Sequence, residues 1–284
     1  MDLYSGIISS LRTADISAVI EDVAATASSR LATPWTLVTV RFPDGTQGRG
    51  ICHNGLSLGR AETVASLVGC DALGAAESLL TCAAGPFSRS LAAATLNALS
   101  APLFSDPSLP GRLGVRCSDL LTEPWDPAAF VPEKGRVAFV GYPPWEVAVV
   151  REASARVTVI EDAPRGDFSV LDTRGTAPDV AVVGVGEREA VLAEADTLFI
   201  LGDAAVHQDL RNILRAAPRA RHKVLFGPST SVFPGPLFDM GVTDLMAMTF
   251  PTTEDFRTEF LQSRGYWYGL PGVRAYLFSR TPKA

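Results

Sequence analysis

Short apolar runs recur through the second half of the chain, separated by segments long enough to form helices. They span residues 136–141, 156–161, 197–201, 223–227 and 244–250. Strands that are buried on both faces have such continuous apolar runs, and helix-length spacers allow parallel crossovers. The pattern therefore predicts a mostly parallel sheet covered by helices, to which residues 273–279 add a last strand, antiparallel at an edge.

The first third of the chain predicts a mixture of strands and helices. Residues 35–42 alternate as a half-buried strand does, and the turn residues Asp44 and Gly45 precede a second short strand, which together predict a hairpin. Residues 61–69 are compatible with a short helix. Helical spacing places five apolar residues on one face of another: Phe87, Leu91, Ala94, Ala98 and Leu99.

A proline-rich stretch separates the two patterns. Six prolines lie between residues 101 and 134, and proline breaks periodic structure because it lacks an amide hydrogen. The sequence therefore predicts an α/β protein in which a smaller α+β domain, residues 1–130, precedes a parallel-sheet domain, residues 131–284.

Composition and charge limit the classes of partner. The 284 residues are 47% hydrophobic and 20% charged, as in soluble globular proteins, and the formal net charge is -6. A negative chain is not attracted to nucleic acid or to anionic membranes. No apolar run reaches the roughly 18 to 20 residues that span a bilayer, and the first residues lack the pattern of a secretion signal. We expect a cytoplasmic protein that binds neither nucleic acid nor a membrane.

The cysteines lack a metal-binding or redox spacing. Cys52, Cys70, Cys82 and Cys117 are scattered without a C-x-x-C pair, which is typical of buried packing thiols in a reducing compartment. His53 adjoins Cys52, but neighbouring residues of a strand point to opposite faces. We therefore do not expect this pair to bind one metal ion.

Loops after parallel strands collect ligands, because helix N-termini and unpaired amides converge there. The loop from Gly141 and Tyr142 to Glu146 contains one glycine and two prolines, so it cannot form the usual glycine-rich pyrophosphate cradle. Glu161 ends the next strand, about 20 residues later, where an acid contacts a nucleotide ribose. An exposed acid at a strand end is the alternative interpretation.

The loop after the run at residues 197–201 carries the candidates for proton or metal chemistry. Gly202 suits a tight turn, and Asp203 suits the N-cap of a helix. His207 then lies in the first or second turn of that helix, where it could coordinate a metal or move a proton. A hydrogen-bonded structural histidine is the alternative.

The loop after residues 223–227 offers small and hydroxyl-bearing residues. Gly227 permits close backbone approach, Pro228 stiffens the turn, and Ser229 and Thr230 supply hydroxyl and amide groups for a carboxylate, phosphate or carbonyl. The loop lacks the G-x-S-x-G pattern, so acyl transfer has little support. A purely structural turn remains the alternative.

These loops together resemble a known family. GYPPWE after the first strand, Glu161, EADTLFILG before a helix and above all FGPSTSVFPGPLFDMGV are similar to the prokaryotic family described as "putative heavy-metal chelation". The resemblance covers residues 136–250 and extends to LNALS around Asn97. It implies a Rossmann-like carboxyl domain, an enolase-amino-terminal-like first domain and a site between them. Where relatives carry a threonine-glycine pair and a helix asparagine, this sequence has Leu201-Gly202 and His207.

The leading hypothesis is that an interdomain cleft binds or processes a small anionic or metal-chelating molecule, with or without a divalent metal ion. Candidate ligand-binding residues are Asn97, Gly141, Tyr142, Glu161, Gly202, Gly227, Pro228, Ser229 and Thr230. His207 and Asp203 are the catalytic candidates, and His207 is the metal candidate. A nucleotide-cofactor-dependent transferase or oxidoreductase and a noncatalytic assembly subunit are the alternatives. A homodimer is the default assembly.

Overall fold

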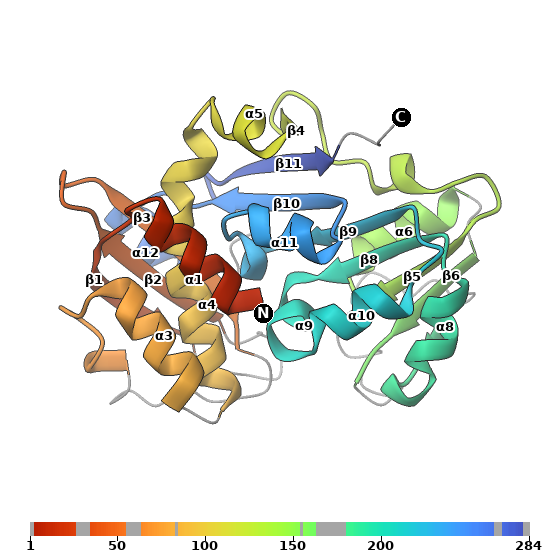
Figure 1. Ribbon diagram of the computed structural model, residues 1–284, viewed down its shortest axis with the longest axis horizontal. Helices are drawn as coiled ribbons and strands as arrows, with labels where there is room; N and C mark the ends of the chain where they lie inside the picture. Colours follow the sequence, from red (N-terminus) through yellow and green to blue (C-terminus); the bar gives the residue numbers. More distant parts are fainter. Residues whose placement is uncertain are drawn as a thin grey trace.

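The computed structural model describes residues 3–26, 35–54, 64–82, 85–153, 156–162, 180–263 and 269–280. Within these ranges the strands form two sheets that lie side by side along the long axis of the molecule (Figure 1). Among the same residues, none of the helices combines the length and the apolar character that crossing a bilayer requires.

The smaller sheet is antiparallel and, within the described residues, contains β1 (Val19–Ala25), β2 (Trp35–Arg41) and β3 (Gln47–His53). The turn between β2 and β3 contains Gly45 at φ +84°, so the predicted hairpin is confirmed. The sequence analysis missed β1, in which a register shift between Ile20 and Asp22 interrupts the regular pairing.

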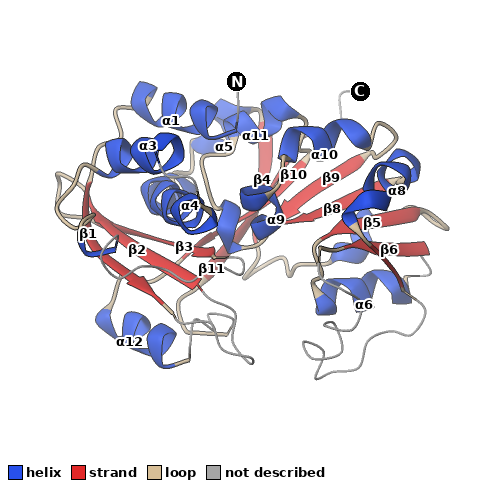
Figure 2. Cartoon of the chain, turned by 90° about the horizontal axis from the view of Figure 1, so that it is seen from below, coloured by secondary structure: helices blue, strands red, loops and turns tan. Residues whose placement is uncertain are grey.

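Helices cover both faces of this sheet (Figure 2). They are α1 (Leu3–Thr13), α3 (Ala72–Cys82) and α4 (Pro86–Ser100) on one face, and α12 (Glu254–Gln262) on the other. Of the short helix predicted at residues 61–69, residues 61–63 lie outside the described part of the chain, residues 64–65 are helical, and residues 66–69 form a turn.

The helix α4 is confirmed, but it is buried on all sides, whereas its sequence predicted one apolar face. Every residue from Ser90 to Ser100 is buried. Glycines of β3 permit this close packing: a Cβ at Gly50 would lie 2.2 Å from the carbonyl oxygen of Ala94, and one at Gly48 would meet the next turn of the helix. The backbone of α4 therefore rests directly on β3.

The larger sheet, as far as the chain is described, has eight strands in the order β4-β11-β10-β9-β8-β5-β6-β7. They are β4 (Val115–Asp119), β5 (Arg136–Val140), β6 (Arg156–Ile160), β7 (Ala181–Val183), β8 (Thr197–Leu201), β9 (His222–Phe226), β10 (Asp244–Thr249) and β11 (Arg274–Arg280). Strands β5 to β10 run parallel, whereas β11 is antiparallel to its neighbours β10 and β4. The predicted mostly parallel sheet is confirmed, and each of the five apolar runs forms a strand.

The edge of this sheet differs from the prediction. Strand β11 is antiparallel as expected, but it is not at the edge, because β4 pairs with its outer side. The sequence analysis assigned residues 115–119 to a connection, since five residues without strict alternation gain a strand partner only once β11 is in place. The division at residue 130 stays a prediction: β4 precedes it and joins the larger sheet, whereas α12 follows it and covers the smaller one.

Helices lie on both faces of the larger sheet (Figure 2). They are α8 (Arg188–Glu194), α10 (Leu210–Ala216) and α11 (Gly235–Met240) on one face and α6 (Pro144–Glu152) on the other, with α9 (Gly202–His207) at the end of β8 and α5 (Leu109–Leu113) near β4. Side chains of β5 alternate accordingly. Ala138 and Val140 belong to the core shared with α8 and α10, and Val137 and Phe139 belong to the core shared with α6.

A buried arginine attaches the smaller sheet to the segment that leads into α12. The side chain of Arg49 is held among polar atoms with only 3% of the residue exposed. Its Nε donates to Thr39 Oγ1 at 2.9 Å, and its Nη1 donates to the carbonyl oxygens of Pro251 at 2.7 Å and Thr253 at 2.9 Å. The guanidinium also lies 5.8 Å from the centre of the Phe256 ring. Arg49 therefore connects to residues that lie 202 and 204 positions away in the chain.

We expect Arg49→Ala to lower the free energy of unfolding by about 2–4 kcal/mol, because it leaves buried carbonyl oxygens without their donor. Arg41→Ala is the matched control, since Arg41 is exposed on the neighbouring strand and pairs with Glu21; it should cost less than about 1 kcal/mol. Urea unfolding of both variants measures the difference. Equal losses of unfolding free energy in the two variants would show that Arg49 does not attach the smaller sheet to the segment that leads into α12.

Candidate functional site

The predicted loops lie at one edge of the larger sheet, because carboxyl ends of neighbouring parallel strands share an edge. Gly141 follows β5, Glu161 follows β6, Gly202 follows β8 and Gly227 follows β9. The last two turns touch, since a Cβ at Gly202 would lie 3.1 Å from Thr230 Oγ1. The turn that carries His207 and the corner from Gly227 to Thr230, which contains the 3-10 turn η4 (Pro228–Thr230), are therefore on the same side of the sheet.

Two glycines are required at this edge for different reasons. Gly227 has φ +102° and ψ 163°, a conformation that residues with a side chain rarely adopt. Gly141 has φ +89°, and a Cβ there would also come within 3.0 Å of Leu201 Cβ. A side chain at Gly227 would strain the backbone. A side chain at Gly141 would strain the backbone and also collide with Leu201.

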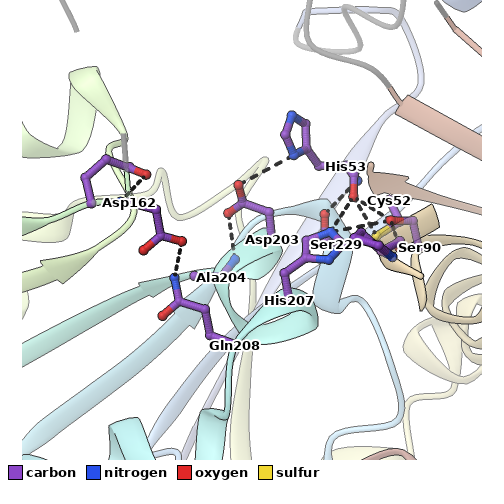
Figure 3. A network of polar contacts seen from close by, with 11 residues as sticks. Cys52, His53, Ser90, Asp162, Asp203, Ala204, His207, Gln208 and Ser229 are labelled. Atoms are coloured by element: carbon purple, nitrogen blue, oxygen red, sulfur yellow. Dashed lines mark hydrogen bonds and ion pairs between the residues drawn. The ribbon is translucent and has the colours of Figure 1, made fainter. Parts of the chain in front are cut away.

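The backbone of His53, at the end of β3, is held by residues of α4, α9 and η4 (Figure 3). Its N–H donates to Ser229 Oγ at 3.1 Å, and its carbonyl oxygen accepts from Ser90 Oγ at 3.0 Å. His207 Nε2 lies 3.1 Å from the same oxygen. Because a carbonyl only accepts, this nitrogen of His207 carries a proton and donates it. The end of the smaller sheet is therefore fastened to the edge of the larger one.

The side chain of His53 faces Asp203 of α9 (Figure 3). Its Nδ1 lies 3.6 Å from Asp203 Oδ2, a distance too long for a hydrogen bond but short enough for electrostatic attraction. Burial lowers the pKa of His53 below its ordinary value, and the Asp203 carboxylate opposes that shift. The ring also packs edge-on against Trp35, with centroids 5.2 Å apart. This pair joins an ionisable group of β3 in the smaller sheet to one of α9, which follows β8 of the larger sheet.

Asn97, a predicted ligand-binding residue, joins β3 to η4 from within α4. It is 1% exposed, and its Nδ2 donates to the carbonyl oxygens of Ile51 at 2.9 Å and Pro228 at 3.0 Å. Its Oδ1 is buried and accepts no hydrogen bond from the described residues. Ser229 and Thr230 are each 2% exposed. In this arrangement the amide and the two hydroxyls lie inside the protein.

Cys52 lies next to this cluster as a buried thiol. It is fully buried, and its Sγ donates to the His53 carbonyl oxygen at 3.4 Å. Burial raises the pKa of Cys52 to about 12, and a hydrogen bond with Ser229 only partly offsets the shift. Cys70, in contrast, is exposed, so the expectation of buried thiols is wrong for that residue.

Other predicted residues lie farther along the edge. Since β9, β8, β5 and β6 are neighbours, the end of β6, with Glu161, lies about 14 Å from the end of β9. Tyr142 packs against the core beside α6. A bridge spans part of this distance: Gln208 Nε2 donates to Asp162 Oδ2 at 3.4 Å, and Arg188 donates to Gln208 Oε1 at 3.1 Å.

The structure thus brings together Asp203, His207, Ser229 and Asn97, but it does so around His53, which the sequence analysis set aside. Ser90 was also missed. A signal for it exists, because Ser90 and Asn97 are seven residues apart and share one face of an otherwise apolar helix. No local pattern marks His53, since its partners come from other parts of the chain.

The donor atoms do not form a closed site for a resident metal ion. Across the described ranges, no group of three or more His, Cys, Asp and Glu side chains could hold one. Two surface cavities of about 420 and 290 Å³ are lined by other residues, among them Cys70 and Asp71 in the first and Arg136 and Glu194 in the second. Neither includes a residue of the His53 cluster.

Comparison with known proteins shows which family the chain resembles. Residues 126–266 match the family described as "putative heavy-metal chelation". The matched residues, just under half of the chain, are similar to that family. The resemblance inferred from the loops is therefore confirmed. None of the curated proteins matches the sequence.

Solved structures of the same family share the fold over the whole chain. A protein of unknown function from Pyrococcus horikoshii is 19% identical, with a TM-score of 0.70, and the match covers 98% of this chain and 99% of that one. A second, from Desulfitobacterium hafniense, is 16% identical, with a TM-score of 0.69 and coverage of 98% and 96%. A mandelate racemase/muconate lactonizing enzyme from Roseiflexus sp. is 15% identical, covering 78% and 90%, but its TM-score of 0.35 is too low to carry an argument.

We expect His207→Ala to lower the free energy of unfolding by about 1–2 kcal/mol, because it removes a donor to the His53 carbonyl oxygen. His207→Gln is the matched control, since its side-chain amide can donate from a similar position, and it should retain most of that stability. Urea unfolding distinguishes the two. If both variants lose the same stability, the imidazole itself is required and this donor role is wrong.

We expect Cys52 to resist alkylation in the folded protein and Cys70 to react. A thiol whose pKa is raised to about 12 has less thiolate at any lower pH, and at pH 8 only about one in ten thousand molecules is ionised. Peptide mass spectrometry after brief treatment with iodoacetamide, with and without urea, measures both sites. Equal labelling of the two cysteines without urea would contradict the burial of Cys52.

Proposed function

We propose that this protein binds a small anionic or metal-chelating molecule, together with its metal, where α9 and η4 meet the end of β3. The observation that carries this proposal is the attachment of the His53 backbone to Ser229, Ser90 and His207. Because of it, residues from both sheets surround one position beside the carboxyl ends of parallel strands, where ligands of open α/β sheets bind. The family description supports the same coarse function, metal chelation.

The charges along this edge favour the metal-loaded form of the ligand. Carboxylates of Asp203, Asp162 and Glu161 follow the ends of β8 and β6. The nearby guanidinium of Arg188 is engaged by Gln208. Carboxylates attract a cation and repel a free polyanion. We therefore propose a metal complex, rather than an empty chelator, as the preferred ligand.

A nucleotide-cofactor-dependent enzyme is the second candidate. Glu161 directly follows β6, the position from which an acid contacts a ribose in dinucleotide-binding sheets. The loop after β5 argues against it, because Pro143 and Pro144 lack the amide donors that a pyrophosphate needs. The metal complex is therefore the better-supported ligand.

Calorimetric titration of the full chain tests the proposal. The probes are Ni²⁺, Zn²⁺, nitrilotriacetate, citrate and the preformed metal complexes, with dinucleotides and S-adenosylmethionine screened by thermal shift. We expect the complexes to bind more tightly than their separate components, and a ligand at 100 times its dissociation constant to add about 2.7 kcal/mol to the stability. Stabilisation of the folded protein by a dinucleotide alone would overturn the proposal in favour of the second candidate.

A further inference from the structure

We infer that His53 and Asp203 form a two-donor clamp for the metal of an incoming metal complex, with one ligand from β3 and one from α9. This inference rests on the proposed function and specifies how the ligand is recognised. The metal is cargo in this scheme, and the chelating molecule that carries it supplies the other donors. His53 thereby receives the metal-binding role that its sequence position did not suggest.

The spacing of the two donor atoms suits a shared metal. His53 Nδ1 and Asp203 Oδ2 are 3.6 Å apart, which exceeds the length of a hydrogen bond. A metal about 2.1 Å from each atom would subtend an angle of about 118° between them, close to the tetrahedral value. His53 ends β3 of the smaller sheet and Asp203 lies in α9, which follows β8 of the larger sheet, so a bound metal would connect the two parts of the protein.

The surrounding contacts hold both donors in place before any ligand arrives. The backbone of His53 is fixed at its N–H and its carbonyl oxygen, and its ring packs against Trp35. Asp203 Oδ1 accepts from the N–H of Ala204 at 2.9 Å, while Oδ2 is the oxygen that faces His53. Such supporting contacts orient metal ligands and raise their affinity.

The neighbouring donors are used for other purposes. His207 Nε2 donates to the His53 carbonyl oxygen, so this nitrogen of the ring has no lone pair for a metal. Cys52 is a fully buried thiol whose pKa of about 12 disfavours the thiolate that metals bind. No third His, Cys, Asp or Glu completes a metal-binding group in the part of the chain that the structure describes. With only two protein donors, the incoming chelating molecule must supply the remaining donor atoms to the metal.

The probe is Ni²⁺–nitrilotriacetate, in which the chelator occupies four octahedral positions of the metal and leaves two adjacent ones open. These are about 90° apart, so the two protein donors fill them by closing from 3.6 Å to about 3.0 Å. We expect the wild-type protein to bind it, and His53→Asn and Asp203→Asn each to weaken binding at least about tenfold. His222→Asn is the matched control. His222 begins β9 at the opposite end of the strand and pairs with Asp244, so its substitution should leave the affinity unchanged.

A second readout places the metal next to His53. Ni²⁺ quenches nearby indole fluorescence, and the Trp35 ring centre is 5.2 Å from that of His53. The complex should therefore quench the wild-type protein. Trp35→Phe should reduce the quenching while calorimetry still detects binding.

The substitutions at His53 should fold, because the contacts that hold this residue use its backbone N–H and carbonyl group, which asparagine retains. Circular dichroism and thermal unfolding check this. If folded His53→Asn binds the complex as the wild type does, or if His222→Asn weakens binding equally, the clamp is wrong although the proposed function stands. If the wild type binds neither the complex nor its components, both are overturned.

Discussion

The close contact between α4 and β3 is the constraint on which the candidate site depends. Side chains normally separate a helix from a sheet, but Gly48 and Gly50 leave room for the helix backbone itself. That contact places Asn97 where it can donate to Ile51 and Pro228, and so it couples the smaller sheet to the corner after β9. A side chain on β3 at either glycine would displace the helix and with it this coupling.

The second consequence of that contact is the arrangement around His53. Its carbonyl oxygen accepts from Ser90 and lies within hydrogen-bond distance of His207. Buried polar groups are costly unless paired, so hydrogen bonds shared between the sheets favour one relative position of the two halves. The hydroxyl of Ser229 and the imidazole of His207 therefore contribute first to holding the junction, and Asp203 and the ring of His53 are the ionisable groups that face each other across it.

Each half of the chain also contributes one element to the sheet formed mainly by the other half. Strand β4 comes from the amino-terminal side and extends the larger sheet beyond β11, while α12 returns from the carboxyl-terminal side to cover β1 to β3. Arg49 and the ion pair between Arg257 and Asp22, with Nε and Oδ2 2.6 Å apart, attach α12 to its sheet. Such crossing elements restrict independent motion of the two sheets.

The sequence by itself determined the parallel strands, the hairpin and α4, because these depend on local periodicity and turn residues. It also placed Asp203 and His207 at the edge of the sheet, since carboxyl ends of parallel strands must meet. The prediction of Asp203 as the N-cap is wrong, because α9 begins at Gly202 and Leu201 takes the N-cap position. Tertiary structure alone decided the role of β4, which needed β11 as a partner, and the position of His53. Ser90, His207 and Ser229, which hold the backbone of His53, lie 37 to 176 residues away in the chain. No pattern within a short segment encodes contacts formed by packing two sheets together.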